Sequence, residues 1–427
     1  MPTDPEQDPS VPESERPASP AASGEAPRKA SWGQLLILFG YSLVNWSIGN
    51  GLLPILPKIA ATLGADKFLT GIYLATSYVA LAVGTIAAGY LADRFGHRKG
   101  LMIGAGLTSA PLIFLASRAT ALWELTALTA STWCIAGMAL TLVTIQAGLS
   151  AGPRQRGSVL GFLALAAPVG SIAGGLGVGT LADALGFSTM WLVLALVVLL
   201  APVLALFVRD VSTRPKAVPL DRAASHPRWT LPFFLLIACA TFAAVGTFIG
   251  GLGRSFAMQD SFSNEAITST VAVSGLVALP FTFLMGWMSD RRGRLPFMGL
   301  CYAAGVLGLL YYAVASSLVQ FWIAASLLAF ISYVSTGIGS ALVVDLVDKS
   351  SLGRGLAYFG TTGWIGAILA FAAGSLAFAA FGLAAGFLLG AALTMAAIGL
   401  LVGVYLATRQ SRAKGRETGT GPGVRKE

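Results

Sequence analysis

Long apolar stretches recur along the chain and alternate with short polar loops. Each stretch is long enough for a helix to cross the hydrocarbon core of a membrane, which takes about 20 apolar residues. The pattern predicts an all-α membrane protein with twelve transmembrane helices. The expected spans are 32–56, 69–92, 101–117, 124–147, 158–182, 187–208, 229–252, 267–288, 296–315, 320–344, 356–381 and 383–406.

One polar loop occurs twice, after the second span and after the eighth. Its first copy contains Gly89, Asp93, Arg94, Gly96, Arg98 and Lys99. Its second copy contains Gly286, Asp290, Arg291 and Gly293 at a constant offset, followed by Arg294. An Arg-Gly pair at Arg156 recurs at Arg354 with nearly the same offset. Repetition of this kind indicates two copies of one membrane unit, so we expect two pseudo-symmetric halves of six helices.

The polar segments divide the chain into five parts. Residues 1–31 are rich in Pro, Ser, Glu and Ala and are expected to form a disordered cytoplasmic tail. Residues 32–208 and 229–406 are expected to form the two halves. Residues 209–228 are expected to form the cytoplasmic linker between the halves, and residues 407–427 are expected to form a basic cytoplasmic tail.

The basic residues predict the orientation. If the N-terminus is cytoplasmic, all of the 28 Lys and Arg residues except Lys58, Lys67, Arg118 and Arg254 fall on the cytoplasmic side. Cytoplasmic loops of membrane proteins carry such an excess. We therefore expect a multi-pass cell-membrane protein, in a bacterial inner membrane, with both termini cytoplasmic. The net charge of +9 suits anionic lipid headgroups, and its division among short loops argues against nucleic acid as a partner.

The spans contain little reactive chemistry. Cys134, Cys239 and Cys301 show no metal-ligand spacing, and both histidines lie in loops. Every charged residue is expected outside the span interiors or at their ends. A charge at the centre of a membrane helix costs roughly 2.5–3.5 kcal/mol on insertion scales, so those that occur usually serve function. We therefore expect no enzyme, no metal and no cofactor.

The string from Gly89 to Lys99 resembles the signature between the second and third helices of the major facilitator superfamily. The resemblance covers residues 32–406 and implies that family's fold and alternating access. It implies that Asp93 joins the two halves on the cytoplasmic side while the transporter opens outward. The second copy departs from the pattern, since Leu295 and Pro296 stand where basic residues should continue. The alternative interpretation of the repeated string is that it is an ordinary basic cytoplasmic loop without a gating role.

The resemblance also implies a charge cluster in each half. Asp290, Asp345 and Arg354 would form one cluster, and Asp93 with Arg156 the other. An arginine at a helix N-terminus is unfavourable beside the helix dipole, so a carboxylate partner is expected nearby. The alternative is that these are solvated loop charges, worth about 0–1 kcal/mol per pair.

In this family spans one, four, seven and ten line the substrate cavity. By position, the candidates are Tyr41, Asn45, Trp46, Asn50, Trp133, Met138, Thr141, Gln146, Phe242, Thr247, Tyr333, Ser335 and Thr336. The amides should face the interior, because an amide in hydrocarbon needs a partner. Helix–helix hydrogen bonding is the alternative to substrate contact for each.

Aromatic rings with neutral polar groups suit a small, uncharged or amphiphilic organic compound. We expect a monomeric secondary active transporter that exports such a compound. An importer or uniporter of a neutral solute such as a sugar is the first alternative, and a non-transporting membrane receptor or scaffold the second.

Two further features bear on direction and coupling. The segment with Pro168, Gly174 and Gly175 resembles, in degraded form, a motif of exporters, and equally fits a kinked, closely packed helix. Proton-coupled relatives often carry an arginine in span four, where this chain has Trp133 and Cys134. The missing arginine argues against classical proton antiport. If a proton is nevertheless the coupled partner, Asp345 is its candidate carrier.

Overall fold

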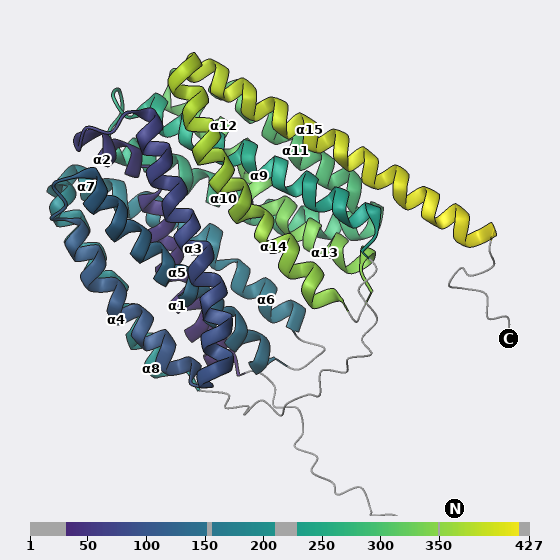
Figure 1. Cartoon of the computed structure of the whole chain (residues 1–427), viewed down its shortest axis with the longest axis horizontal. Coiled ribbons are helices and arrows are strands. Elements are labelled where there is room, and N and C mark those ends of the chain that lie inside the picture. The colour runs from purple at the N-terminus through teal and green to yellow at the C-terminus, as the bar shows by residue number, and fades with distance from the viewer. Residues whose placement is uncertain (1–30, 152–155, 210–228, 349–350, 418–427) are drawn as a thin grey trace, which may run out of the picture.

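The computed structural model describes residues 31–151, 156–209, 229–348 and 351–417, which form two helical halves (Figure 1). The first half consists of α1 (Trp32–Leu52), α2 (Leu56–Thr62), α3 (Lys67–Phe95), α4 (Arg98–Ala116), α5 (Leu122–Ser150), α6 (Arg156–Ala164), α7 (Ala166–Val198) and α8 (Leu200–Leu206). The second consists of α9 (Leu231–Met258), α10 (Asn264–Arg292), α11 (Arg294–Tyr312), α12 (Leu318–Ala329), η1 (Phe330–Ser335), α13 (Thr336–Leu346), α14 (Leu352–Leu369), η2 (Ala370–Gly374) and α15 (Ser375–Glu417). The segments η1 and η2 are π-helical.

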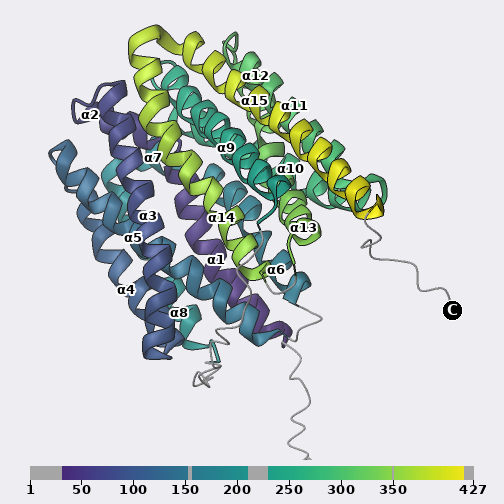
Figure 2. The same cartoon turned by 45° about the vertical axis from the view of Figure 1, so that its right-hand side comes forward.

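Two glycine turns account for the number of membrane crossings. Ten helical stretches of the described chain are long and apolar enough to span a membrane, and two of them, Gly157–Leu206 and Leu352–Gln410, have 50 and 59 residues. Each is interrupted by a glycine with positive φ, 77° at Gly186 and 83° at Gly382. Figures 1 and 2 show the second turn, where the yellow-green start of α15 bends sharply into its yellow remainder. With these two turns, the described helices form the twelve expected crossings.

Pro168 sets another break, at the start of α7. A proline lacks the backbone N–H and its ring clashes with the carbonyl four residues earlier. That residue is Ala164, where α6 ends, and α7 begins at Ala166. The kink expected in span five is therefore present.

Hydrogen bonds gather several helix ends of the first half at one face. Gln34 donates through Nε2 to the carbonyl of Phe207 (3.0 Å), and Lys99 through Nζ to the carbonyl of Leu206 (2.5 Å). Gln146 donates through Nε2 to the carbonyl of Arg209 (2.7 Å). We call this end, which holds the repeated basic loops, the basic face. The other end, which holds Lys58, is the opposite face.

The two halves are bonded to each other at the opposite face. The Asp183 carboxylate, on α7, accepts from the backbone N–H of Asn264 (3.1 Å) and of Glu265 (2.7 Å), and from Asn264 Nδ2 (2.7 Å). It thus caps the N-terminus of α10 from the other half. Lys58 Nζ donates to the carbonyl of Phe262 (3.1 Å). Among the described residues, the one other hydrogen bond between the halves joins Ser171 and Tyr333 (2.6 Å).

Glycines of α7 allow its close approach to α10. A Cβ built on Gly175 would lie 2.6 Å from the backbone nitrogen of Ala272 and 2.7 Å from the carbonyl oxygen of Thr268. A Cβ on Gly275, from α10, would lie 2.6 Å from the carbonyl oxygen of Pro168. Small residues let membrane helices pack backbone to backbone. Gly175 therefore has a packing role at the boundary between the halves, whereas Gly174 packs against Ser47 and Gly51 of α1 within the first half.

The domain boundaries differ from expectation at the C-terminal end. The last helix, α15, continues to Glu417, into the segment expected to be a tail. Alanine, glutamine, arginine and lysine favour helix, so the chain has no local reason to stop at Leu406. Nearly all of the expected tail 1–31 lies outside the described residues. The same holds for the linker 209–228, apart from its first residue.

Candidate functional site

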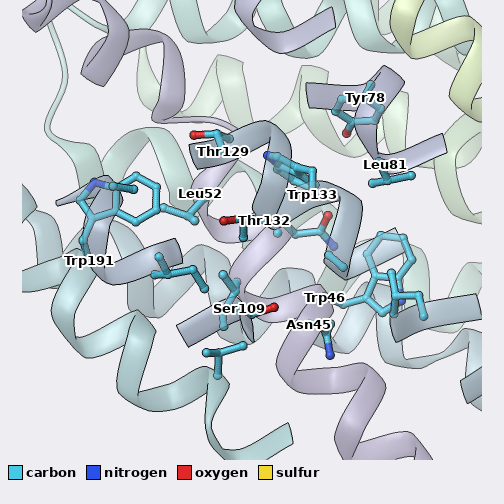
Figure 3. A pocket seen from close by; sticks show the side chains of 18 of the residues that line it. Asn45, Trp46, Leu52, Tyr78, Leu81, Ser109, Thr129, Thr132, Trp133 and Trp191 are labelled. Carbon is cyan, nitrogen blue, oxygen red and sulfur yellow. The ribbon is translucent and has the colours of Figure 1, made fainter. Parts of the chain in front are cut away.

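A cavity inside the first half is the candidate site (Figure 3). It has a volume of about 70 Å³, measured as the space open to the centres of water molecules. The lining comes from α1, α3, α4, α5 and α7, with one residue of the second half, Trp364 on α14. Its nineteen lining residues include none with a charge. A space of this size holds several water molecules, since one water needs roughly 10–15 Å³ on this measure.

Aromatic rings dominate the lining. Five of its residues are aromatic: Trp46, Tyr78, Trp133, Trp191 and Trp364. The ring of Tyr78 lies 5.6 Å from that of Trp133 and 6.2 Å from that of Trp364, between centroids. It also contacts Phe248 and Phe371 of the second half, at 5.4 Å and 5.1 Å. Tyr78 is therefore the ring through which the cavity touches both halves.

The polar groups of the cavity are amides and hydroxyls. Asn45 donates through Nδ2 to the carbonyl of Tyr41 (2.9 Å), and Asn50 through Nδ2 to Ser171 Oγ (2.7 Å). Among the described residues, no donor reaches the Oδ1 of either amide. These oxygens can accept hydrogen bonds from a ligand, because each amide keeps acceptor capacity after its NH₂ is used.

Four of the expected cavity residues line this cavity: Asn45, Trp46, Asn50 and Trp133. The others do not: Tyr41, Met138, Thr141, Gln146, Phe242, Thr247, Tyr333, Ser335 and Thr336. The Tyr41 hydroxyl instead donates to the carbonyl of Met102 on α4 (2.9 Å), which is the helix–helix alternative. Gln146 donates to the carbonyl of Arg209, in the segment that follows α8.

Several lining residues were not predicted from the sequence, including Tyr78, Thr129, Thr132, Trp191 and Trp364. The predicted cavity residues came from spans one, four, seven and ten alone, whereas α3, α4, α7 and α14 also contribute. A signal was present in span four, where Thr129, Thr132, Trp133, Ala136 and Leu140 all line the cavity. Their spacing of three and four residues places them on one helix face. No comparable pattern singles out Trp191 or Trp364.

The first copy of the repeated loop forms a tight turn at the basic face. Gly96 has φ 65° and ends α3, which suits the left-handed conformation that glycine adopts without strain. Arg94 donates to the Tyr90 hydroxyl (2.9 Å), and Arg98 is buried at the start of α4. A Cβ on Gly89 would meet nothing within 4 Å, so no helix packs against it in this conformation. The side chains of Asp93 and Arg156 lie outside the described residues, and the gate stays a prediction.

The second copy forms an ion-pair cluster that differs from the expected one. Arg294 Nη2 lies 3.5 Å from Asp290 Oδ1, and its Nε lies 3.2 Å from Asp345 Oδ2. Arg294, rather than Arg354, is therefore the cation that joins the two carboxylates. Gly293 has φ 95°, and this turn places Arg294 at the start of α11, four residues after Asp290. Arg354 is exposed on α14 and forms no ion pair with a described residue.

Two further arginines, Arg291 and Arg254, pack against neighbouring side chains rather than forming ion pairs with described residues. Arg291 stacks over the Trp287 ring, with its Cζ 3.9 Å from the ring centroid. Arg254 was expected in an outer loop but lies inside α9, one turn before its end, and is 8% exposed. This position near the end of α9 agrees with the expectation that charges lie outside the span interiors or at their ends, but packing between helices buries this turn.

Comparison with known proteins supports the fold. The family described as Major Facilitator Superfamily matches residues 33–258 and again residues 234–425. A mutant of the nucleoside transporter NupG is similar in structure, with a TM-score of 0.70 and 13% identity, covering 88% of this chain and 99% of that one. A bacterial homolog of the human lysosomal transporter Spinster, solved inward-facing and unoccupied, has a TM-score of 0.63 and 17% identity, covering 88% and 94%. Comparison with curated proteins found no match.

Proposed function

Because the chain belongs to the Major Facilitator Superfamily, we propose that it is a transporter that exports a small, uncharged or amphiphilic organic compound by alternating access. The observation that carries the proposal is the aromatic cavity of the first half. Five aromatic rings and two amide oxygens surround a space without any charged lining residue. Apolar walls with a few placed polar groups are typical of sites for small organic ligands.

The cavity favours some solutes over others. An ionised group inside it would lose its hydration without gaining a counter-ion, which is strongly unfavourable. An aromatic or aliphatic part would stack against the rings of Trp133 and Tyr78 instead. Hydroxyl or amino groups would donate to the Oδ1 of Asn45 or Asn50. We therefore propose that the part of the compound held here is neutral.

Alternating access is supported by the distribution of contacts between the halves. Among the described residues, every hydrogen bond between the halves lies at the opposite face or in the central part. We propose that the basic face is cytoplasmic, because it carries the basic loops. In that orientation this conformation is closed to the exterior. The Asp93 gate would then form in the other conformation, when the halves meet at the basic face.

The proposal is tested by transport in vesicles that contain the purified protein. Inside-out vesicles with an acidified lumen should accumulate neutral aromatic compounds, because protons leave the lumen as the compound enters, whereas charged analogues of equal size should be transported far less. Gradient-independent exchange of neutral polyhydroxylated solutes would instead support the importer or uniporter, which the free amide oxygens of Asn45 and Asn50 also suit. Absence of flux for every compound that binds would contradict transport.

Replacing Trp133 by leucine is expected to weaken binding of the transported compound about 3–10-fold. An aromatic pair contributes roughly 0.5–1.5 kcal/mol beyond the area that it buries. Isothermal titration on the purified protein measures the effect. Trp123→Leu is the matched control, because Trp123 lies on the same helix and is 71% exposed. Equal losses of affinity in the two variants would show that the cavity is not the binding site.

A further inference from the structure

Arg254 is a buried cation at the boundary between the two halves. Its side chain comes from α9, is 8% exposed, and its Nε has no hydrogen-bond partner. No carboxylate of the described residues forms an ion pair with it. Charged residues inside membrane segments are expensive and usually serve a function, so this arginine calls for a ligand or a partner.

The surroundings of Arg254 are almost wholly apolar. It lines a cavity of about 30 Å³ between residues of both halves. The other lining residues are Leu53, Pro54, Pro57 and Leu74 of the first half and Phe248, Gly251, Leu252, Ser255 and Phe371 of the second. The Tyr312 hydroxyl lies beside the guanidinium, and the Nε of Arg254 has no hydrogen-bond partner. A neutral hydroxyl does not balance the charge of the guanidinium, so the described residues supply no anionic partner at this point.

The helix ends nearby offset only part of the cost of this charge. Both α9 and α11 end close to Arg254, at Met258 and Tyr312. The C-terminal end of a helix carries partial negative charge, which favours a cation. The helix ends do not supply the Nε of Arg254 with an acceptor, however, and they carry no full negative charge. A planar guanidinium matches the two oxygens of a carboxylate or phosphate, which it can bind through two parallel hydrogen bonds.

We propose that Arg254 binds an oxyanion, a carboxylate or phosphate-type group, when the two halves separate at the opposite face. Separation would move the lining residues of the first half away from α9 and expose the guanidinium to the aqueous entrance. An anion that binds this conformation alone shifts the equilibrium towards it. The oxyanion is either a group on an organic solute or a free ion. The site shares no lining residue with the aromatic cavity, so its failure would leave the proposed function intact.

The test is a distance measurement across the opposite face of the purified full-length protein. Spin labels at Thr62→Cys and Ser261→Cys, both exposed and on different halves, report the separation in a Cys134→Ala background. Sodium sulfate or phosphate is compared with sodium chloride at equal ionic strength. We expect the oxyanion to increase the fraction of the longer distance, and Arg254→Gln to abolish this increase. Arg118→Gln, at an exposed arginine of the same face, should leave it unchanged.

Further arms identify the source of the oxyanion and guard against misfolding. A response to hexanoate, but to neither hexanol nor phosphate, places the group on an organic solute, whereas a response to phosphate as well identifies a free ion. Arg254→Lys keeps the charge but loses the planar fork, so the oxyanion should bind it about tenfold more weakly. An equal response in wild type and Arg254→Gln would overturn the proposal, as would no response in wild type. If the glutamine variant does not fold, an unchanged affinity in the lysine variant overturns it.

Discussion

Replacing Gly175 by alanine is expected to separate the two halves at the opposite face. The added Cβ would lie 2.6 Å from the backbone nitrogen of Ala272 and 2.7 Å from the carbonyl oxygen of Thr268. Backbone atoms of a packed helix cannot move aside individually, so α7 and α10 must separate. Overpacking of this kind costs roughly 1–3 kcal/mol, and that cost falls only on the conformation in which the helices touch. The ratio of closed to open molecules should therefore fall roughly 5–150-fold.

The measurement is the distance between labels at Thr62→Cys and Ser261→Cys, together with the transport rate. Transport should slow, because the cycle requires the opposite face to close. Gly177→Ala is the matched control: it lies on the same helix, and a Cβ there meets nothing within 4 Å. If both alanine variants kept the distance distribution of the wild type, close packing of α7 on α10 would not determine the conformation.

Replacing Asp183 by alanine is expected to act in the same direction and somewhat more weakly. The carboxylate caps the N-terminus of α10 through three hydrogen bonds of 2.7–3.1 Å. Removing a helix cap typically costs about 0.5–2 kcal/mol. This cap comes from the other half of the protein, so it stabilises only the conformation in which the opposite face is closed. At the upper limit of about 2 kcal/mol, the ratio of closed to open molecules should fall roughly 30-fold, because each 1.4 kcal/mol changes an equilibrium constant tenfold.

A second aspartate provides the control for Asp183. Asp66 caps α3 from within its own half, with the Leu69 N–H donating to its Oδ1 (2.7 Å). Asp66→Ala should lower the thermal stability of the protein without changing the distance across the opposite face. The change in distance that Asp183→Ala causes should also be smaller at high salt. The wild-type carboxylate is exposed, so salt screens its interaction with the N-terminus of α10. Equal distance changes in both variants would mean that the cap between halves has no special role.

The sequence was sufficient to predict the helices and their order. Apolar length identifies a membrane helix, because backbone groups must be satisfied inside each segment in hydrocarbon. The repeated loop at Gly89 and Gly286 identified the two halves before any contact was known. The limits of the expected spans also located the two glycine turns, near Gly186 and Gly382. These features are local, so the order of residues was enough.

The site was predicted only in part. Asn45, Trp46, Asn50 and Trp133 were expected and line the cavity, whereas Trp364 was not expected. A membrane helix is apolar on all sides, so its hydrophobic pattern does not show which side faces a cavity and which faces lipid. Trp123 and Trp133 belong to one helix, yet only the second lies at the site.

Residue order alone determined that this chain crosses a membrane in two similar sets of helices, with basic loops gathered at one end, because these properties depend on length, hydrophobicity and charge along a single segment. Only the tertiary structure decided that the halves meet at the opposite face, that Arg294 joins Asp290 and Asp345, and that Arg254 is buried without a carboxylate partner among the described residues. Each of these depends on how helices distant in sequence rotate and approach one another. That arrangement is set by close contacts, such as Gly175 against Ala272, which no single segment encodes.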